Sequence, residues 1–163
     1  MMTEKESYIQ LKKDNILRIG IKDAQGNDTG NHLEFDLEDI EFPLRLNQAE
    51  AQHRRNIEDL KAQFIIIDKK QDKQGKYLLT WKQEEKLKAL KEFYNKDIKA
   101  MEMFLGEGMV SKLLNGRKPY YEMYDDISEM LEPIMPMLKT STENIIDKIK
   151  GKYGNKKEND VLE

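Results

Sequence analysis

The sequence has no cysteine in its 163 residues, so it can form neither disulfide bonds nor thiolate metal sites. It has no stretch close to the roughly 18 apolar residues that a membrane-spanning helix needs. Its first residues, MMTEKESYIQLKKDN, lack the apolar core of a secretory signal. We therefore expect a cytoplasmic protein with no membrane partner.

The sequence also has little excess of either charge. Its net charge of −3 is too small to predict nucleic-acid or membrane binding by electrostatics. The charges are unevenly placed, because acidic residues gather within residues 34–41 and lysines within residues 69–76. Two solvated faces account for this distribution, and a self-complementary contact between subunits is the alternative.

Two segments near the N-terminus have the alternating pattern of β-strands. Residues 15–21 (NILRIGI) and 32–37 (HLEFDL) are the two predicted strands, and residues 22–31, with Gly26-Asn27 and Gly30, predict the turn between them. The apolar face of such a hairpin has to lie on helices or on another subunit. Its edges are open to pairing with another chain.

A long helix is predicted after this hairpin. Phe42-Pro43 predicts a break in the chain, and Asn47 is a candidate N-cap. Residues 64–67 (FIII) are compatible with a short buried strand, but the preceding pattern favours helix. The apolar positions recur at helical spacing and comprise Ala49, His53, Ile57, Leu60, Phe64 and Ile67.

A second long helix follows a polar loop at residues 71–77. Thr80 and Gln83 form a capping box at its start, and Gly106 is a suitable residue for its end. The two long helices are therefore expected to be antiparallel neighbours. The predicted apolar stripe of the second helix comprises Leu87, Leu90, Tyr94, Ile98, Met101 and Leu105.

Shorter helices are predicted in the last third of the chain. One covers residues 109–115, and Pro119 can open another. Pro133 and Pro136 break or kink the chain. A capping box of Thr140 and Glu143 predicts a last helix. Its inward residues are Ile145, Ile146 and Ile149.

These patterns predict an α+β fold that is predominantly α, with an N-terminal β-hairpin followed by a bundle of two long and several short helices. The expected organisation is a hairpin region at residues 1–46, a helical domain at residues 47–150 and a polar, flexible tail at residues 151–163.

No catalytic, cofactor-binding or metal-binding residues are predicted. His32 and His53 have no carboxylate or cysteine at ligand spacing, which predicts a surface or helix-packing role for both. Asp36, Asp39 and Asp125-Asp126 could act as acids or bases only in a concave pocket that the sequence does not indicate. Gly106-Glu107-Gly108 follows a helix, whereas a phosphate-binding loop follows a strand. We expect a protein that is not an enzyme.

Several segments together resemble a known family. The acidic segment FDLEDIEFPLR precedes two long helices, and the second ends in FLGEG before SKLLNGR and a tyrosine-rich helix. This order resembles the tail assembly chaperones of long-tailed phages and prophages of Gram-positive bacteria, from about residue 16 to residue 153. The residues that carry it are Phe104, Leu105, Gly106, Glu107, Gly108, Lys112, Leu113, Leu114 and Gly116.

The resemblance implies a helical, non-enzymatic protein of the host bacterial cytoplasm. Such chaperones bind and solubilise the tape measure protein and recruit tail tube subunits, and self-association is expected. Methionine and tyrosine side chains suit adaptable binding surfaces. The predicted partner-binding residues lie in one apolar groove and comprise Phe104, Leu105, Leu113, Leu114, Tyr120, Tyr121, Met135 and Met137.

Two alternatives remain at this stage. A structural component of the phage tail is one, although such proteins are usually rich in strands. A nucleic-acid-binding regulatory protein is the other, with lysines at residues 69–76 and 82–91 as its footprint. Interleaved acidic residues and the negative net charge count against nucleic acid as a partner.

Overall fold

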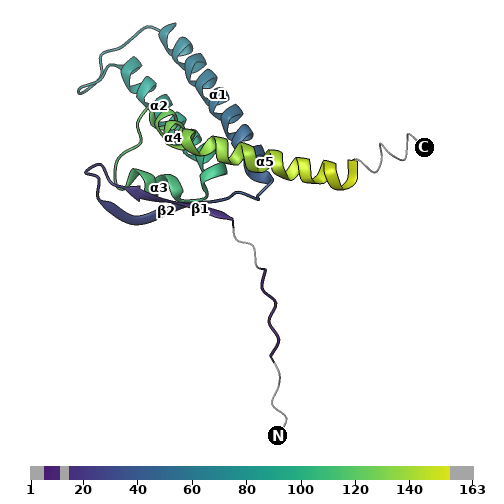
Figure 1. Ribbon diagram of the computed structural model, residues 1–163. Coiled ribbons are helices and arrows are strands. Elements are labelled where there is room, and N and C mark those ends of the chain that lie inside the picture. The colour runs from purple at the N-terminus through teal and green to yellow at the C-terminus, as the bar shows by residue number, and fades with distance from the viewer. Residues whose placement is uncertain (1–5, 12–14, 155–163) are drawn as a thin grey trace.

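The computed structural model describes residues 6–11 and 15–154. A two-stranded antiparallel hairpin is followed by a mostly helical region, which confirms the predicted α+β, predominantly α fold (Figure 1). Residues 6–11 form an extended arm that projects from the body of the molecule. The side chains of Tyr8, Ile9 and Leu11 on this arm are almost fully exposed.

The hairpin consists of β1 (Ile16–Lys22) and β2 (Asp28–Asp36). Strand β2 begins at Asp28 rather than at the predicted His32, because the turn is confined to the residues around Gly26, whose φ is 84°. Leu17 is paired with Phe35 and Ile19 with Leu33 across the strands. Cross-strand apolar pairs of this kind stabilise a hairpin that has one face buried. The face that carries these pairs lies against the helices.

Helix α1 (Glu41–Asp68) begins earlier than the sequence predicts. The expected break at Phe42-Pro43 and the N-cap at Asn47 are both wrong, since Pro43 lies in the first turn, where no backbone N–H donor is needed. Asp39 replaces the missing cap, because its Oδ1 accepts a hydrogen bond from the Glu41 amide at 2.9 Å. The FIII segment is helical, as the preceding pattern indicates.

Helix α2 (Trp81–Leu105) begins with the predicted capping box, in which Thr80 and Gln83 bond to each other's backbone amides. Its predicted apolar stripe is partly wrong, because Leu87 is 51% exposed. The buried face of α2 instead includes the small side chains of Ala89 and Ala100. The buried residues of α2 are Ala89, Phe93, Asp97, Ala100, Met101, Phe104 and Leu105.

Three shorter helices follow: α3 (Met109–Leu114), α4 (Met123–Leu131) and α5 (Met135–Ile149). Pro119 does not open a helix, since α4 begins at Met123. A 3-10 turn, η1 (Glu132–Ile134), separates α4 from α5, which confirms the break around Pro133. Lys150–Gly154 (η2) continues the chain beyond α5 as a π-helical turn.

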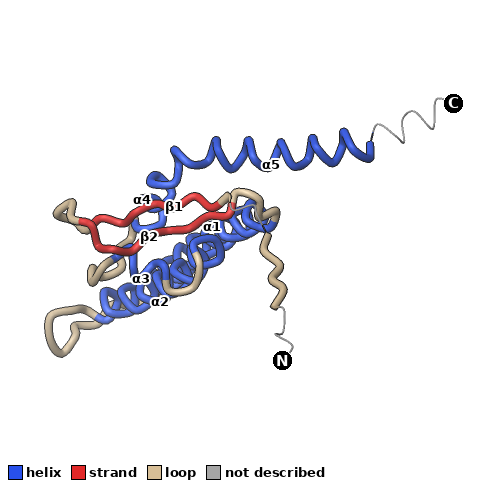
Figure 2. The backbone as a smooth tube through the Cα atoms, turned by 60° about the horizontal axis from the view of Figure 1, so that its bottom comes forward, coloured by secondary structure: helices blue, strands red, loops and turns tan. Residues whose placement is uncertain are grey.

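The start predicted for the last helix is wrong. Helix α5 already begins at Met135, with Pro136 in its first turn, so Thr140 lies inside the helix and caps nothing. Ile146 and Ile149 are not inward, because α5 leaves the body of the molecule after its first turns and runs outward (Figures 1 and 2).

Two apolar clusters hold the fold together. The larger one joins the inner face of the hairpin to α3, α4, the first turns of α1 and the end of α2. The smaller one lies farther along the α1–α2 pair and is built on Leu60, Ala89 and Phe93. The part of α1 between the two clusters contributes the buried polar residues His53 and Asn56.

Candidate functional site

An apolar groove lies between the first turns of α1 and the start of α5. Its volume is about 800 Å³. Phe42, Pro43 and Leu46 line it from α1, and Met135, Pro136 and Leu138 line it from α5. A second hollow of about 410 Å³, bordered by α4, shares Leu46 and Met135 with the first. The two hollows are therefore neighbours along α1.

The apolar side of this groove continues onto the projecting part of α5. Leu138, Thr142, Ile145 and Ile149 recur at intervals of three and four residues and so share one helix face. Burial falls along this stripe, from Leu138 at 8% exposed to Ile149 at 56%. Nothing in the described chain covers the outer half of the stripe, which is therefore open to a partner.

The lining of the groove carries charges of both signs. Glu132 and Glu143 contribute carboxylates and Lys139 an ammonium group. Ser141 donates a hydrogen bond to the carbonyl oxygen of Leu37, which attaches the start of α5 to the end of the hairpin.

The structure separates the predicted partner-binding residues. Phe104 and Leu105 are each 5% exposed and belong to the larger apolar cluster. Side chains packed against the hairpin offer little area for contact with a partner, so their predicted role in partner binding stays a prediction. Met135 does line the apolar groove, whereas Met137 is 47% exposed and lines no hollow described here.

Leu113, Leu114 and Tyr120 lie in a different hollow of about 670 Å³, which the hairpin turn borders. Tyr120 donates a hydrogen bond to Asp126 at 2.7 Å, and the Arg117 guanidinium lies 4.1 Å from its ring centre. The hydrogen bond to Asp126, followed by burial, raises the pKa of Tyr120. Tyr121 is 56% exposed, and its ring centre is 6.0 Å from that of Phe93.

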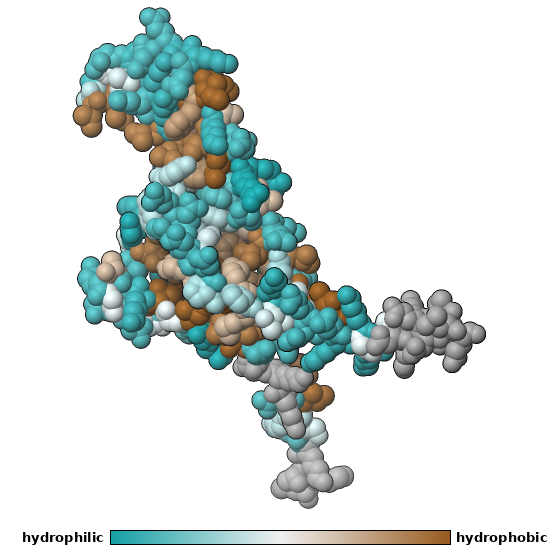
Figure 3. Space-filling view, turned by 45° about the horizontal axis from the view of Figure 1, so that its top comes forward, coloured by the Kyte–Doolittle hydropathy of each residue, from teal (hydrophilic) through white to brown (hydrophobic). Residues whose placement is uncertain are grey.

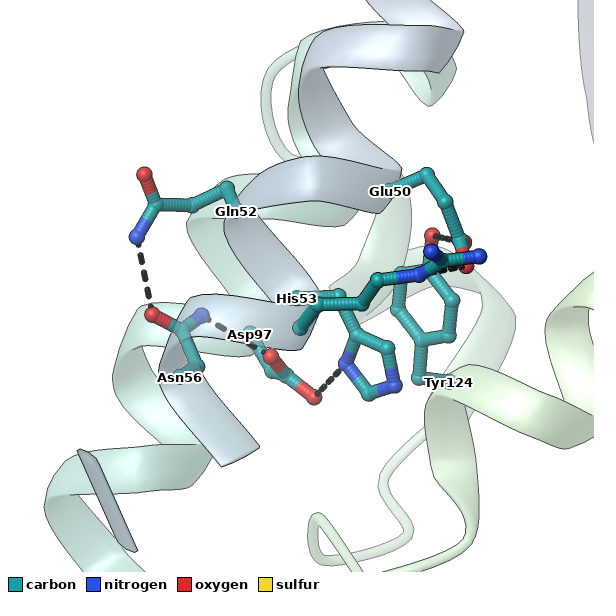
Figure 4. A network of polar contacts seen from close by, with 7 residues as sticks. Glu50, Gln52, His53, Asn56, Asp97 and Tyr124 are labelled. Carbon is teal, nitrogen blue, oxygen red and sulfur yellow. Dashed lines mark hydrogen bonds and ion pairs between the residues drawn. The ribbon is translucent and has the colours of Figure 1, made fainter. Parts of the chain in front are cut away.

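A buried polar network joins α1, α2 and α4 (Figure 4). The carboxylate of Asp97, which is 2% exposed, lies 2.8 Å from Nδ1 of His53 and accepts a hydrogen bond from Asn56 Nδ2 at 2.9 Å. The His53 ring stacks on Tyr124 with ring centres 3.6 Å apart. Tyr124 in turn donates to Glu50 Oε2 at 2.7 Å.

This network fits a structural role. Burial, followed by the hydrogen bond to Glu50, raises the pKa of Tyr124 well above its usual range, so the hydroxyl stays a neutral donor. Every buried polar side-chain atom in the described chain has a hydrogen-bond partner. A paired histidine and aspartate can orient a nucleophile, but in the described contacts His53 bonds to Asp97 alone.

Within residues 6–11 and 15–154, no group of three or more histidine or carboxylate side chains is placed to hold a metal ion. No helix in the same residues is both long and apolar enough to cross a membrane. Comparison with known proteins adds nothing further, since no protein-family model, curated protein or solved structure matches this chain.

Sequence reasoning missed half of the apolar groove. Phe42, Leu46 and Ala49 are spaced four and three residues apart, and this pattern would have extended α1 backwards. The predicted break at Pro43 excluded this earlier start of α1. The pairing of His53 with Asp97 had no local signal, because 44 residues separate the two.

Proposed function

We propose that this protein is a phage tail assembly chaperone, which binds and solubilises the tape measure protein in the host bacterial cytoplasm and helps recruit tail tube subunits. The observation that carries the proposal is the apolar groove between α1 and α5, together with the uncovered stripe of α5 that prolongs it. A protein that keeps an apolar helix in solution needs such a surface rather than an enclosed pocket.

The groove suits a helical partner. An amphipathic helix binds a groove through apolar residues at intervals of three and four positions, and the stripe of α5 repeats at those intervals. At 15 residues, α5 is about 22 Å long, which is enough to contact four turns of a partner helix. Met135 adds a flexible side chain that adapts to different partner residues.

The proposal can be tested by co-expressing the protein with the tape measure protein from the same genome. Size exclusion with light scattering then reports whether a soluble complex forms and how many copies of this chain it holds. Ile149→Asp is the informative variant, because this side chain is 56% exposed and its replacement leaves the core intact. We expect this variant to remain folded and to leave the partner insoluble.

Two matched variants separate the possible surfaces. Leu87→Asp changes a side chain that is 51% exposed on α2, far from the groove, and should retain the complex. Met130→Asp, at 57% exposed, alters the hollow that contains Leu113 and Leu114 instead. Loss of binding in Met130→Asp alone would move the site to that hollow. If the partner stays insoluble with the unmodified chain and this protein is found in purified tails, the results would favour a structural tail component.

A further inference from the structure

The far end of the α1–α2 pair carries an exposed apolar tip surrounded by lysines. The tip consists of residues 68–82, in which Tyr77 is 84% exposed and Leu78 is 90% exposed. Apolar side chains are visible at this end of the molecule in Figure 3. Residues 68–82 contain five lysines and two aspartates, so the tip is basic as well as apolar.

The tip has an ordered shape. Asp72 Oδ1 accepts hydrogen bonds from the amides of Lys73 and Lys82, and the Trp81 amide donates to the Lys73 carbonyl oxygen at 2.9 Å. Gly75 lies so close to Leu79 that an added Cβ would be 1.7 Å from the Leu79 carbonyl oxygen. These contacts hold the backbone on both sides of Tyr77 and Leu78, and a loop ordered in this way lowers the entropic cost of docking.

The opposite end of the α1–α2 pair has the complementary character. A hollow of about 400 Å³ lies there, lined by the exposed apolar side chains of Ile16 and Met103. The carboxylates of Glu34, Asp36 and Asp39 and the guanidinium of Arg45 also line it. Five acidic residues lie within residues 34–41. Arg18 and His32 pair with Glu34, and Arg45 pairs with Asp39 and Glu41. In the described chain, Asp36 and Glu38 have no such ion pair.

The two ends cannot meet within one molecule. Helix α1 has 28 residues and separates them by about 42 Å. We infer that the basic tip of one copy docks, through Tyr77 and Leu78 with Lys73 and Lys76 beside them, into the acidic hollow of a second copy. The contact joins two different surfaces, so a docked pair keeps one free hollow, on the first copy, and one free tip, on the second. Contacts of this type build rings or open chains.

This inference concerns the chain alone and does not depend on the proposed tape measure partner. Sedimentation velocity over a range of concentrations measures it directly. We expect the unmodified chain to form assemblies larger than a dimer, and added salt to weaken them because it screens the lysine–carboxylate attraction. A chain that stays monomeric at all concentrations would overturn the inference.

Charge reversal provides the sharper test. One variant carries Lys73→Glu and Lys76→Glu at the tip, and the other carries Asp36→Lys and Glu38→Lys at the hollow. All four side chains are exposed, so both variants should fold, as circular dichroism can verify. The tip variant then has an excess of acidic residues at both ends, and the hollow variant loses most of the negative charge that attracts the tip. We expect the association of each variant alone to weaken by about tenfold or more.

Mixing the two variants in equal amounts places the introduced glutamates opposite the introduced lysines at one contact and leaves the other contact unmodified, so assembly should return with the copies alternating. A control variant, Lys112→Glu with Lys118→Glu, makes the same charge change at exposed positions outside both ends and should assemble as the unmodified chain does. Unchanged assembly of either reversed variant, or no recovery on mixing, would contradict the docking. The docking would also be contradicted if the chain is monomeric and its tip binds phosphatidylglycerol vesicles instead.

Discussion

The Oδ2 atom of Asp97 lies 2.8 Å from Nδ1 of His53, and this contact joins the two long helices between two apolar clusters. Asn56 bonds to the second carboxylate oxygen of Asp97. Because buried polar groups are costly unless paired, only one register of α1 against α2 satisfies all three side chains. The network therefore selects the alignment of the helical pair, while the apolar clusters supply most of its stability.

Removal of the central carboxylate should be strongly destabilising. Asp97→Ala leaves His53 and Asn56 without their buried acceptor, and we expect the free energy of unfolding to fall by about 3 kcal/mol. Urea denaturation followed by circular dichroism measures this loss. Asp59→Ala changes an exposed carboxylate on α1 and should alter stability by less than about 0.5 kcal/mol. Similar losses in both variants would contradict a special role for Asp97.

Two threonines test where helices begin. Thr80→Ala removes a side-chain cap from α2 and should cost about 1 kcal/mol of unfolding free energy. Thr140→Ala changes an exposed residue inside α5, where alanine is the better helix former, and should cost nothing. Thermal or urea unfolding of the two variants compares them directly. A loss in Thr140→Ala equal to that in Thr80→Ala would indicate that a helix starts at Thr140 after all.

The cap at the start of α1 should be sensitive to acid. The hydrogen bond from Arg45 lowers the pKa of Asp39 below its usual value. The contribution of the ionised Asp39 carboxylate to stability is therefore complete above the unfolded-state pKa of about 3.9. It disappears as the pH falls through the folded-state pKa. We expect Asp39→Asn to be less stable than the unmodified chain at neutral pH. The two unfolding curves should converge in acid, and a difference that persists there would exclude this ionisation as the cause.

Tyr124 should make stability sensitive to alkali. Its pKa is raised in the folded protein, so its contribution is complete below the unfolded-state pKa of about 10 and is lost as the pH rises above it. At neutral pH, Tyr124→Phe loses the hydrogen bond to Glu50 and about 1 kcal/mol of stability. Above pH 10 the unmodified chain should lose stability more steeply than the variant. Parallel pH profiles would contradict this account.

The sequence by itself determined the features that depend on neighbouring residues. The capping box at Thr80, the alternating strands and the break around Pro133 all follow from backbone hydrogen bonding and allowed φ and ψ angles, which act over a few residues. Pro43 shows the limit of such reasoning, because the same residue breaks a helix interior and fits a first turn.

Only the tertiary structure decided which side chains are buried. Phe104 and Leu105 lie in the core because the hairpin folds onto the end of α2, while Ile146 and Ile149 are exposed because no described element covers the outer part of α5. Asp97 could be buried only because His53 and Asn56 reach it from another helix. Burial depends on partners distant in sequence, and a local pattern of apolar and charged residues does not report them.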